Sequence, residues 1–311
     1  MSNILVTGGA GYIGSTLVPD LLAQGHQVTV VDNLMYRQTS LSGSIRNRNL
    51  NLVIGDVRDE SLMKSHISTA DVIIPLAAIV GAPACDKDPI AAKSINRDSI
   101  FWLLKNISKS QQLIMPTTNS AYGSGDENNY CDEKSPLNPL SLYARDKVEV
   151  ENALMQHENA TSFRLATVFG LSPRMRLDLL VNNFVFRAVT DGFVIIFEGH
   201  FKRNYIHVMD VVQAFNLALK NPNEFKSEVF NVGLSEANIS KLELCEVISN
   251  LVPNFTFMEA PLGKDPDQRN YIVSNQKIEQ KGFRPAVSLK DGIEELIRGI
   301  RMFNHKPFTN L

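Results

Sequence analysis

The 311-residue sequence has few cysteines, no surplus of either charge and no long apolar run. Its three cysteines, Cys85, Cys131 and Cys245, lack metal-ligand spacing and an even-numbered disulfide framework. Lys and Arg number 31 against 33 Asp and Glu, which does not suggest nucleic-acid binding. No run approaches the roughly 18 apolar residues of a membrane span, and the N-terminus lacks a signal-peptide pattern. We therefore expect a cytoplasmic protein with no metal, membrane or nucleic-acid partner.

The sequence does contain a regular alternation of strand-like and helix-like segments in its first half. This alternation predicts an α/β fold, a Rossmann doubly wound parallel sheet with helices on both faces. Beyond residue 165 the pattern loosens into helices, one strand and no clear linker, which predicts a smaller second domain built from several crossings of the chain. The expected strands are 4–6, 28–31, 50–54, 72–74, 113–115 and 229–232; the expected helices are 17–22, 60–67, 90–104, 177–189, 208–220, 242–251 and 288–303; and 126–139 is an expected loop.

Glycines at positions 8, 11 and 14 follow the first expected strand and open the first expected helix. In that context they predict a dinucleotide site, because the loop lets the backbone approach a diphosphate at the N-terminus of a helix. Asp32 ends the second strand, where its carboxylate would bind ribose hydroxyls and repel a 2′-phosphate, so the predicted cofactor is NAD. Asp56 follows the third strand and either meets the adenine or caps the next helix.

Tyr143 and Lys147 are four residues apart and would share one face of a helix. A neighbouring ammonium favours the phenolate, so the tyrosine is a candidate general base for oxidising an alcohol. Tyr130 and Lys134 have the same spacing, but they fall in the polar loop and a proline follows at once, which disfavours a helix. Ser141 is a plausible cap for the helix of Tyr143, so we predict that Tyr143 and Lys147 are the catalytic pair.

Thr118 follows the expected strand 113–115. A hydroxyl at the carboxyl end of a parallel strand lies where open α/β sheets place their active sites. From the residues alone, Thr118 is either a substrate contact beside Tyr143 or part of an ordinary Ser/Thr turn.

These motifs, together with Arg203-Asn204-Tyr205-Ile206-His207-Val208 and Asn231-Val232-Gly233, resemble the extended short-chain dehydrogenase/reductase family, the NAD-dependent nucleotide-sugar epimerases and dehydratases. The resemblance implies an NAD-binding Rossmann domain over 1–170, with 208–235 returning to it. It implies a smaller α+β domain over 171–207 and 236–311 that binds a nucleotide-diphosphate sugar. It also implies a homodimer joined through helices.

The resemblance assigns site residues along the chain. As catalytic residues it implies Thr118, Tyr143 and Lys147. As cofactor-binding residues it implies Gly8, Gly11, Tyr12, Ile13, Gly14, Asp32, Asn33, Asp56, Val57, Leu76, Ala77, Ala78 and Asn96, besides Tyr143 and Lys147. As substrate-binding residues it implies Asn119, Ser120, Thr167, Arg174, Asn182, Arg203 and Arg269, besides Thr118.

One departure from the family pattern bears on the reaction. The 4,6-dehydratases of the family carry Asp-Glu directly after the catalytic Thr, whereas this sequence has Asn119-Ser120. This pair and the segment 174–182 resemble the branch that oxidises GDP-heptose. We therefore predict NAD-dependent oxidation of the C4 hydroxyl of a nucleotide sugar. The alternatives are a 4-epimerase, which would use the same catalytic residues, and a non-catalytic NAD-binding redox sensor.

Overall fold

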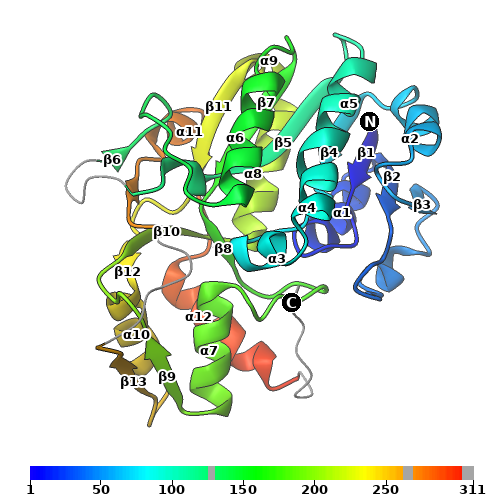
Figure 1. The fold of residues 1–311 in the computed structure, drawn as a ribbon. Helices are drawn as coiled ribbons and strands as arrows, with labels where there is room; N and C mark the ends of the chain where they lie inside the picture. The colour runs from blue at the N-terminus through cyan, green and yellow to red at the C-terminus, as the bar shows by residue number, and fades with distance from the viewer. Residues whose placement is uncertain (125–129, 262–268, 303–311) are drawn as a thin grey trace.

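The computed structural model describes residues 1–124, 130–261 and 269–302. Part of the expected loop 126–139 and Phe303, the last residue of the expected terminal helix, therefore lie outside the described residues. In Figure 1 a large sheet occupies the upper part of the molecule, and the shorter strands β9 and β13 lie below it with α7, α10 and α12.

The large sheet has seven strands in the order β11-β7-β5-β4-β1-β2-β3, and every neighbouring pair is parallel. Counted along the chain, the first six strands have the 3-2-1-4-5-6 order of the Rossmann fold, so the predicted fold class is confirmed. The strands are β1 (Asn3–Thr7), β2 (Gln27–Asp32), β3 (Leu50–Ile54), β4 (Val72–Pro75), β5 (Gln112–Thr118), β7 (Ala160–Leu165) and β11 (Glu228–Val232).

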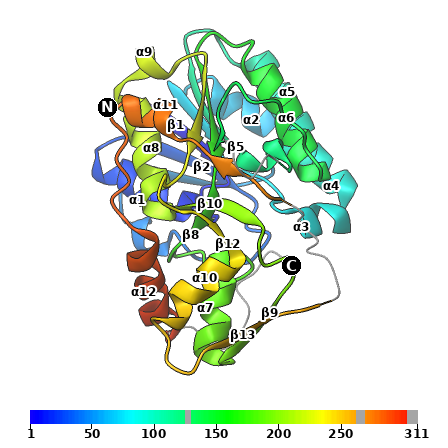
Figure 2. The same cartoon turned by 90° about the vertical axis from the view of Figure 1, so that its left-hand side faces the viewer.

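Helices cover both faces of this sheet (Figure 2). Successive strand residues point to opposite faces, so Ile4 and Val6 join the core under α1 and α8, while Leu5 joins the core under α2, α5 and α6. This burial on both sides explains why β1 and β4 appear as continuous apolar runs in the sequence. The buried strand β7 carries Thr161, Ser162 and Arg164 instead, which is why the expected strands did not include it. The helices are α1 (Gly14–Ala23), α2 (Glu60–Ile67), α5 (Ser99–Asn106), α6 (Leu142–Leu154) and α8 (Val208–Lys220).

The helix expected over 90–104 is not continuous. The chain forms α4 (Pro89–Lys93), then a π-helical turn over Ser94–Asp98, and then α5. Asn96 lies in this wide turn, and its amide donates to the Ile79 carbonyl and accepts from the Ile79 N–H, both at 2.8 Å. A π turn inside a helix commonly marks a functional position, and here it places Asn96 against the chain that follows β4.

The second half contains small sheets that the sequence pattern did not predict. Their strands are two to six residues long, too short to produce a clear periodicity. They are β12 (Asn238–Ser240), β10 (Lys202–His207) and β8 (Thr167–Phe169) in one sheet, β13 (Thr256–Glu259) with β9 (Phe193–Ile196), and β14 (Ile272–Val273) with β6 (Tyr130–Cys131). The helices packed beside them share a separate apolar core; they are α7 (Leu180–Thr190), α10 (Lys241–Ser249) and α12 (Leu289–Ile300). The remaining described elements are three short α-helices, α3 (Ala82–Lys87), α9 (Pro222–Phe225) and α11 (Gln276–Gln280), and two 3₁₀ helices over Ser42–Ser44 and Asn119–Tyr122.

Some features are absent from the described part of the chain. It contains no helix with the length and apolar character needed to cross a membrane. Nor does it bring three or more His, Cys, Asp or Glu side chains together as a metal site. The three cysteines are buried and form no disulfide.

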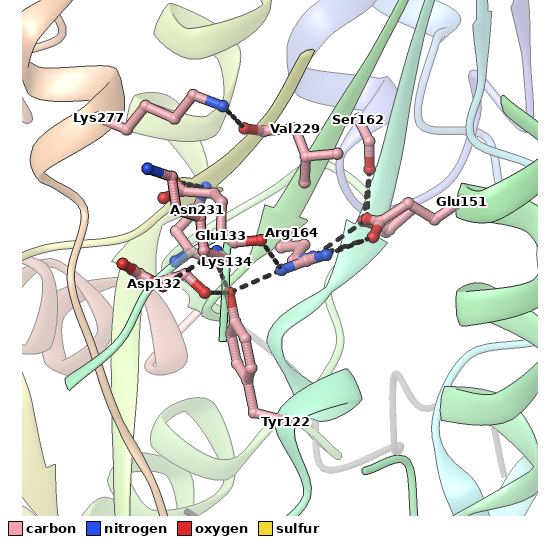
Figure 3. Close-up of polar contacts among 11 residues, drawn as sticks. Tyr122, Asp132, Glu133, Lys134, Glu151, Ser162, Arg164, Val229, Asn231 and Lys277 are labelled. Carbon is pink, nitrogen blue, oxygen red and sulfur yellow. Dashed lines mark hydrogen bonds and ion pairs between the residues drawn. The ribbon is translucent and has the colours of Figure 1, made fainter. Parts of the chain in front are cut away.

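A buried ion pair ties α6 to the large sheet (Figure 3). The Arg164 guanidinium on β7 donates to Glu151 on α6, with 2.6 Å between Nη2 and Oε1, and both side chains are about 5% exposed. Its Nη1 also donates to the Tyr122 hydroxyl at 3.0 Å, and Ser162 donates to the Glu151 carboxylate at 2.7 Å. Because these hydrogen bonds compensate for lost hydration, the pair is tolerated in the core, but neither charge is tolerated alone.

We expect Glu151→Ala to destabilise the protein by about 3–5 kcal/mol, because it leaves the Arg164 charge buried without its carboxylate. The matched control is Glu228→Ala, which breaks a half-exposed pair with Lys277 at 2.6 Å and should cost less than about 1 kcal/mol. Chemical denaturation gives both values. Equal effects of the two substitutions would show that the buried pair is not a special anchor of α6.

Candidate functional site

A cavity of about 420 Å³ opens at the carboxyl ends of the central strands, where β1 lies between β2 and β4. This is the position at which the strand order reverses and open α/β sheets bind their ligands. Its walls come from the glycine loop, the segments after β4 and β5, the first turns of α6, and the chain from β8 to α7. The cavity therefore joins the large sheet to the second half of the chain.

The glycine loop forms one wall. Gly8 has a φ of +66°, and a side chain there would place its Cβ only 2.5 Å from the Ala77 nitrogen. Glycine is therefore required for this close approach between the chains that follow β1 and β4. Tyr12 and Ile13 also line the cavity, together with Gly11 and Gly14, at the start of α1. The bare backbone and the helix N-terminus give the chemistry that a dinucleotide diphosphate requires.

Asp32 is buried and does not line the cavity. One carboxylate oxygen accepts from the Ala10 N–H at 2.9 Å, and the other accepts from the Leu34 N–H at 2.9 Å. Gln38 also donates to it at 3.2 Å. The carboxylate therefore fixes the glycine loop to the end of β2, in addition to its predicted role towards the ribose.

Asp56, which follows β3, contacts Asn33 and Arg58 near the protein surface. Asn33 donates to Asp56 at 3.3 Å, and hydrogen bonds from the Arg58 guanidinium lower the pKa of Asp56 to about 2. The helix α2 is capped by Asp59, which accepts from the Leu62 N–H, so the capping alternative for Asp56 is wrong. Neither Asn33 nor Asp56 lines the cavity.

The chain after β4 forms a second wall. Leu76 and Ala78 line the cavity, whereas Ala77 contacts Gly8 from behind. Val57 packs against the apolar group around Cys85 and does not reach the cavity. Asn96 also lies behind this wall, since its amide is occupied by Ile79. The structure thus gives Asn96 a supporting position rather than a place in the cavity lining.

Thr118, Tyr143 and Lys147 all line the cavity. The Ser141 hydroxyl accepts from the Ala144 N–H at the start of α6, as the sequence predicted, so Tyr143 and Lys147 lie one turn apart on that helix. Lys147 is 4% exposed and donates to the Pro116 carbonyl at 3.3 Å. Thr118 ends β5 and donates to the Ser120 hydroxyl at 2.9 Å.

The competing pair has a different setting. Tyr130 is 58% exposed and belongs to the two-residue strand β6, not to a helix. Lys134 follows in a turn, where its N–H donates to Asp132. The prediction that a helix carries Tyr143 and Lys147, and that no helix carries Tyr130 and Lys134, is confirmed.

The electrostatics of the pair differ from the sequence-based expectation. Burial raises the pKa of Tyr143 to about 12, against the opposing effect of Arg176 and Arg269. Burial also lowers the pKa of Lys147 to about 8. Desolvation therefore has a larger effect on the pKa of Tyr143 than the nearby arginines have.

Several predicted substrate residues from the second half of the chain line the cavity. Arg203 on β10 and Thr167 on β8 line it, together with Arg269. The Arg269 Nη1 donates to the Ser120 hydroxyl, which in turn accepts from Thr118. One hydroxyl thus links an arginine to the candidate catalytic threonine.

Two predicted substrate residues do not line the cavity. Asn182 is fully buried on α7, where its Oδ1 accepts from the Gly170 N–H at 3.0 Å and its Nδ2 donates to the Tyr12 hydroxyl at 3.3 Å and to the Arg176 carbonyl at 2.9 Å. These contacts engage its amide with protein groups, so Asn182 supports the cavity wall from behind. Asn119 is 1% exposed and also lies behind the surface.

The structure adds lining residues that sequence reasoning did not select. Arg176 and Asp178 line the cavity as an ion pair. The signal in the sequence was two charges within an otherwise apolar run over 175–181. Tyr36 also lines the cavity from the segment after β2, and no sequence signal pointed to it.

Comparison with known proteins places this geometry in a family. A putative UDP-glucose 4-epimerase of Methanocaldococcus jannaschii is 28% identical, with 97% of this chain and 99% of that protein covered. A dTDP-glucose 4,6-dehydratase of Streptomyces niveus is also 28% identical, with 96% of this chain and 92% of that protein covered.

A solved structure supports the same assignment. The UDP-glucose 4-epimerase of Thermus thermophilus, in complex with NAD, superimposes with a TM-score of 0.83 at 25% identity, over 96% of this chain and 99% of that one. The sequence profile of the NAD dependent epimerase/dehydratase family matches residues 4–233. The chain therefore belongs to the NAD dependent epimerase/dehydratase family, and the predicted cofactor, NAD, is confirmed.

Proposed function

We propose that this chain oxidises the C4 hydroxyl of a nucleotide-activated sugar to the 4-keto sugar, with NAD as oxidant. The observation that carries the proposal is that Thr118, Tyr143 and Lys147 line one cavity with the glycine loop. GDP-heptose is our preferred substrate, because Asn119-Ser120 and the segment 174–182 resemble the GDP-heptose 4-dehydrogenases. The corresponding role is in capsule or surface polysaccharide biosynthesis.

The residues of the cavity divide the chemistry between them. The Tyr143 phenolate takes the proton from the C4 hydroxyl, and Thr118 donates a hydrogen bond to the same oxygen. When bound, NAD would supply the acceptor for the C4 hydride and the positive charge of its nicotinamide ring. Because burial raises the pKa of Tyr143, that charge, with Arg176 and Arg269, is needed to favour the phenolate.

The charge of the cavity supports a diphosphate substrate. Five of the charged side chains that line it in the described part of the chain are cationic, whereas one, Asp178, is anionic. The cations are Lys147, Arg174, Arg176, Arg203 and Arg269. Guanidinium groups suit phosphate oxygens because they donate two parallel hydrogen bonds.

The two residues that follow Thr118 do not suit a dehydration reaction. Elimination of water across C5 and C6 needs one group to take a proton and another to give one. Asn119 and Ser120 follow Thr118 and neither exchanges a proton near neutral pH. Two more distant carboxylates do not replace them: Glu198 does not line the cavity, and Asp178 lines it but is paired with Arg176. We therefore propose oxidation with retention of the C6 oxygen.

A 4-epimerase is the second candidate. The relative from M. jannaschii and the structure from T. thermophilus carry that name, and the reaction uses the same base, hydroxyl and cofactor. The third candidate, a redox sensor, requires no turnover of any sugar.

The division into a cofactor domain over 1–170 with 208–235 and a substrate domain over 171–207 and 236–311 is part of the proposal, as are the cytoplasmic location and the homodimer.

The product should keep its C6 oxygen. We expect mass spectrometry after incubation with NAD and a panel of GDP-, UDP- and dTDP-sugars to show loss of two hydrogens, or the hydrated ketone. An unchanged mass with inverted C4 stereochemistry would favour the epimerase. Loss of one water from the sugar would refute the proposal, and no turnover of any sugar would favour the sensor.

Tyr143→Phe should lower the turnover rate by about 10²–10⁴-fold, because it removes the general base. Tyr130→Phe is the matched control and should leave the rate unchanged, since its ring is exposed on β6. Steady-state rates with saturating NAD measure both. A larger loss in the Tyr130 variant would overturn the choice between the two pairs.

Arg203→Ala and Arg269→Ala should each weaken binding of the nucleotide sugar by about 1.5–3 kcal/mol, the cost of a charge-assisted hydrogen bond. Binding of NAD should change little. Calorimetric titration with each ligand separates the two effects. An equal loss for both ligands would count against diphosphate contacts from these arginines.

A further inference from the structure

The backbone of Arg174 is fixed to the N-terminal turn of α1. Its N–H donates to the Ser15 hydroxyl at 3.2 Å. Ser172, two residues earlier, shares a hydrogen bond with Ser15 at 2.9 Å and donates to the Tyr12 carbonyl at 2.6 Å. The Arg174 side chain therefore extends from a backbone position beside the N-terminus of α1, the helix end at which we predict the cofactor diphosphate.

The side chain of Arg174 also stays on the cofactor side of the cavity. Its guanidinium stacks on the Tyr36 ring, 4.7 Å from the centroid, and Tyr36 follows β2 by a few residues, close to Asp32. Arg174 is 4% exposed. The guanidinium also donates to the Met175 carbonyl, and guanidinium groups in general bind phosphate oxygens through their in-plane N–H groups.

The other cavity arginines have different surroundings. Arg269 donates to Ser120, beside Thr118 at the end of β5. Arg203 lies on β10, a strand outside the large sheet. Arg176 is paired with Asp178. Arg174, by contrast, contacts Ser15 in the first turn of α1 and Tyr36 in the segment after β2.

We propose that Arg174, positioned by Ser15 and Tyr36, binds the diphosphate of NAD beside the N-terminus of α1. This replaces its predicted role as a substrate residue. The backbone N–H groups of the glycine loop and the Arg174 guanidinium would then both donate to the diphosphate, a doubly charged anion. The buried cation benefits in turn, because burial and the neighbouring Arg176 lower the pKa of Arg174, and a bound anion compensates the lost hydration.

The inference depends on the NAD cofactor but not on the proposed sugar reaction. It is tested by binding alone, with protein stripped of nucleotide and titrated with NAD, ADP and adenosine. We expect Arg174→Ala to weaken NAD and ADP by about 10- to 100-fold, the loss of a charge-assisted hydrogen bond, and to leave adenosine unchanged, since adenosine has no phosphate. Arg187→Ala is the matched control, because this half-exposed arginine of α7 lies outside the cavity lining, and it should bind all three as the wild type does.

Further variants keep the test decisive. Arg174→Gln retains most of the side-chain volume without the charge and should give the same pattern, so it replaces Arg174→Ala if that variant does not fold. Tyr36→Phe keeps the ring and should bind ADP like the wild type. An equal loss of adenosine and ADP would overturn the diphosphate contact. Unchanged NAD binding with weakened binding of a GDP-sugar would return Arg174 to the substrate.

Discussion

A closed set of hydrogen bonds among Tyr12, Gly170 and Asn182 holds the two walls of the cavity together. The Tyr12 hydroxyl donates to the Gly170 carbonyl at 2.7 Å, and the Asn182 amide bonds both the Gly170 N–H and that hydroxyl. These groups are buried, so losing one partner would leave polar groups without water or protein contacts. The glycine loop, the end of β8 and α7 are thereby fixed to one another.

Gly170 is the most constrained position in this arrangement. Its φ is +109°, and a Cβ there would lie 2.1 Å from the His207 Nε2. His207 in turn pairs with Glu295 on α12 at 3.4 Å, and Glu295 accepts from the Leu171 N–H at 3.0 Å. The terminal helix is therefore attached to the same crossing, which explains how residues more than a hundred positions apart shape one site.

The cavity then has a clear division. The large sheet and its helices supply the glycine loop, the threonine at the end of β5 and the helix of Tyr143 and Lys147. The Arg164–Glu151 pair attaches that helix to the sheet. The chain between β8 and α7, with β10 and Arg269, supplies four guanidinium groups. A site with this charge favours anions, and it tolerates its buried cations best when phosphates are bound.

The sequence by itself determined the elements whose physical causes are local. Glycine spacing at 8, 11 and 14 with Asp32, continuous apolar runs and the helix cap at Ser141 were sufficient to predict the parallel sheet, the cofactor and the helix that carries Tyr143 and Lys147. Only the tertiary structure decided what depends on residues distant in the chain: the amide of Asn182 is occupied by Tyr12 and Gly170, the helix at Asn96 widens to meet Ile79, and the Tyr36 ring lies under Arg174. The pKa of Tyr143 belongs to this second group, because burial by the whole fold raises it more than nearby cations lower it. Spacing along a helix shows which side chains share a face, but not how much water the rest of the chain removes from them.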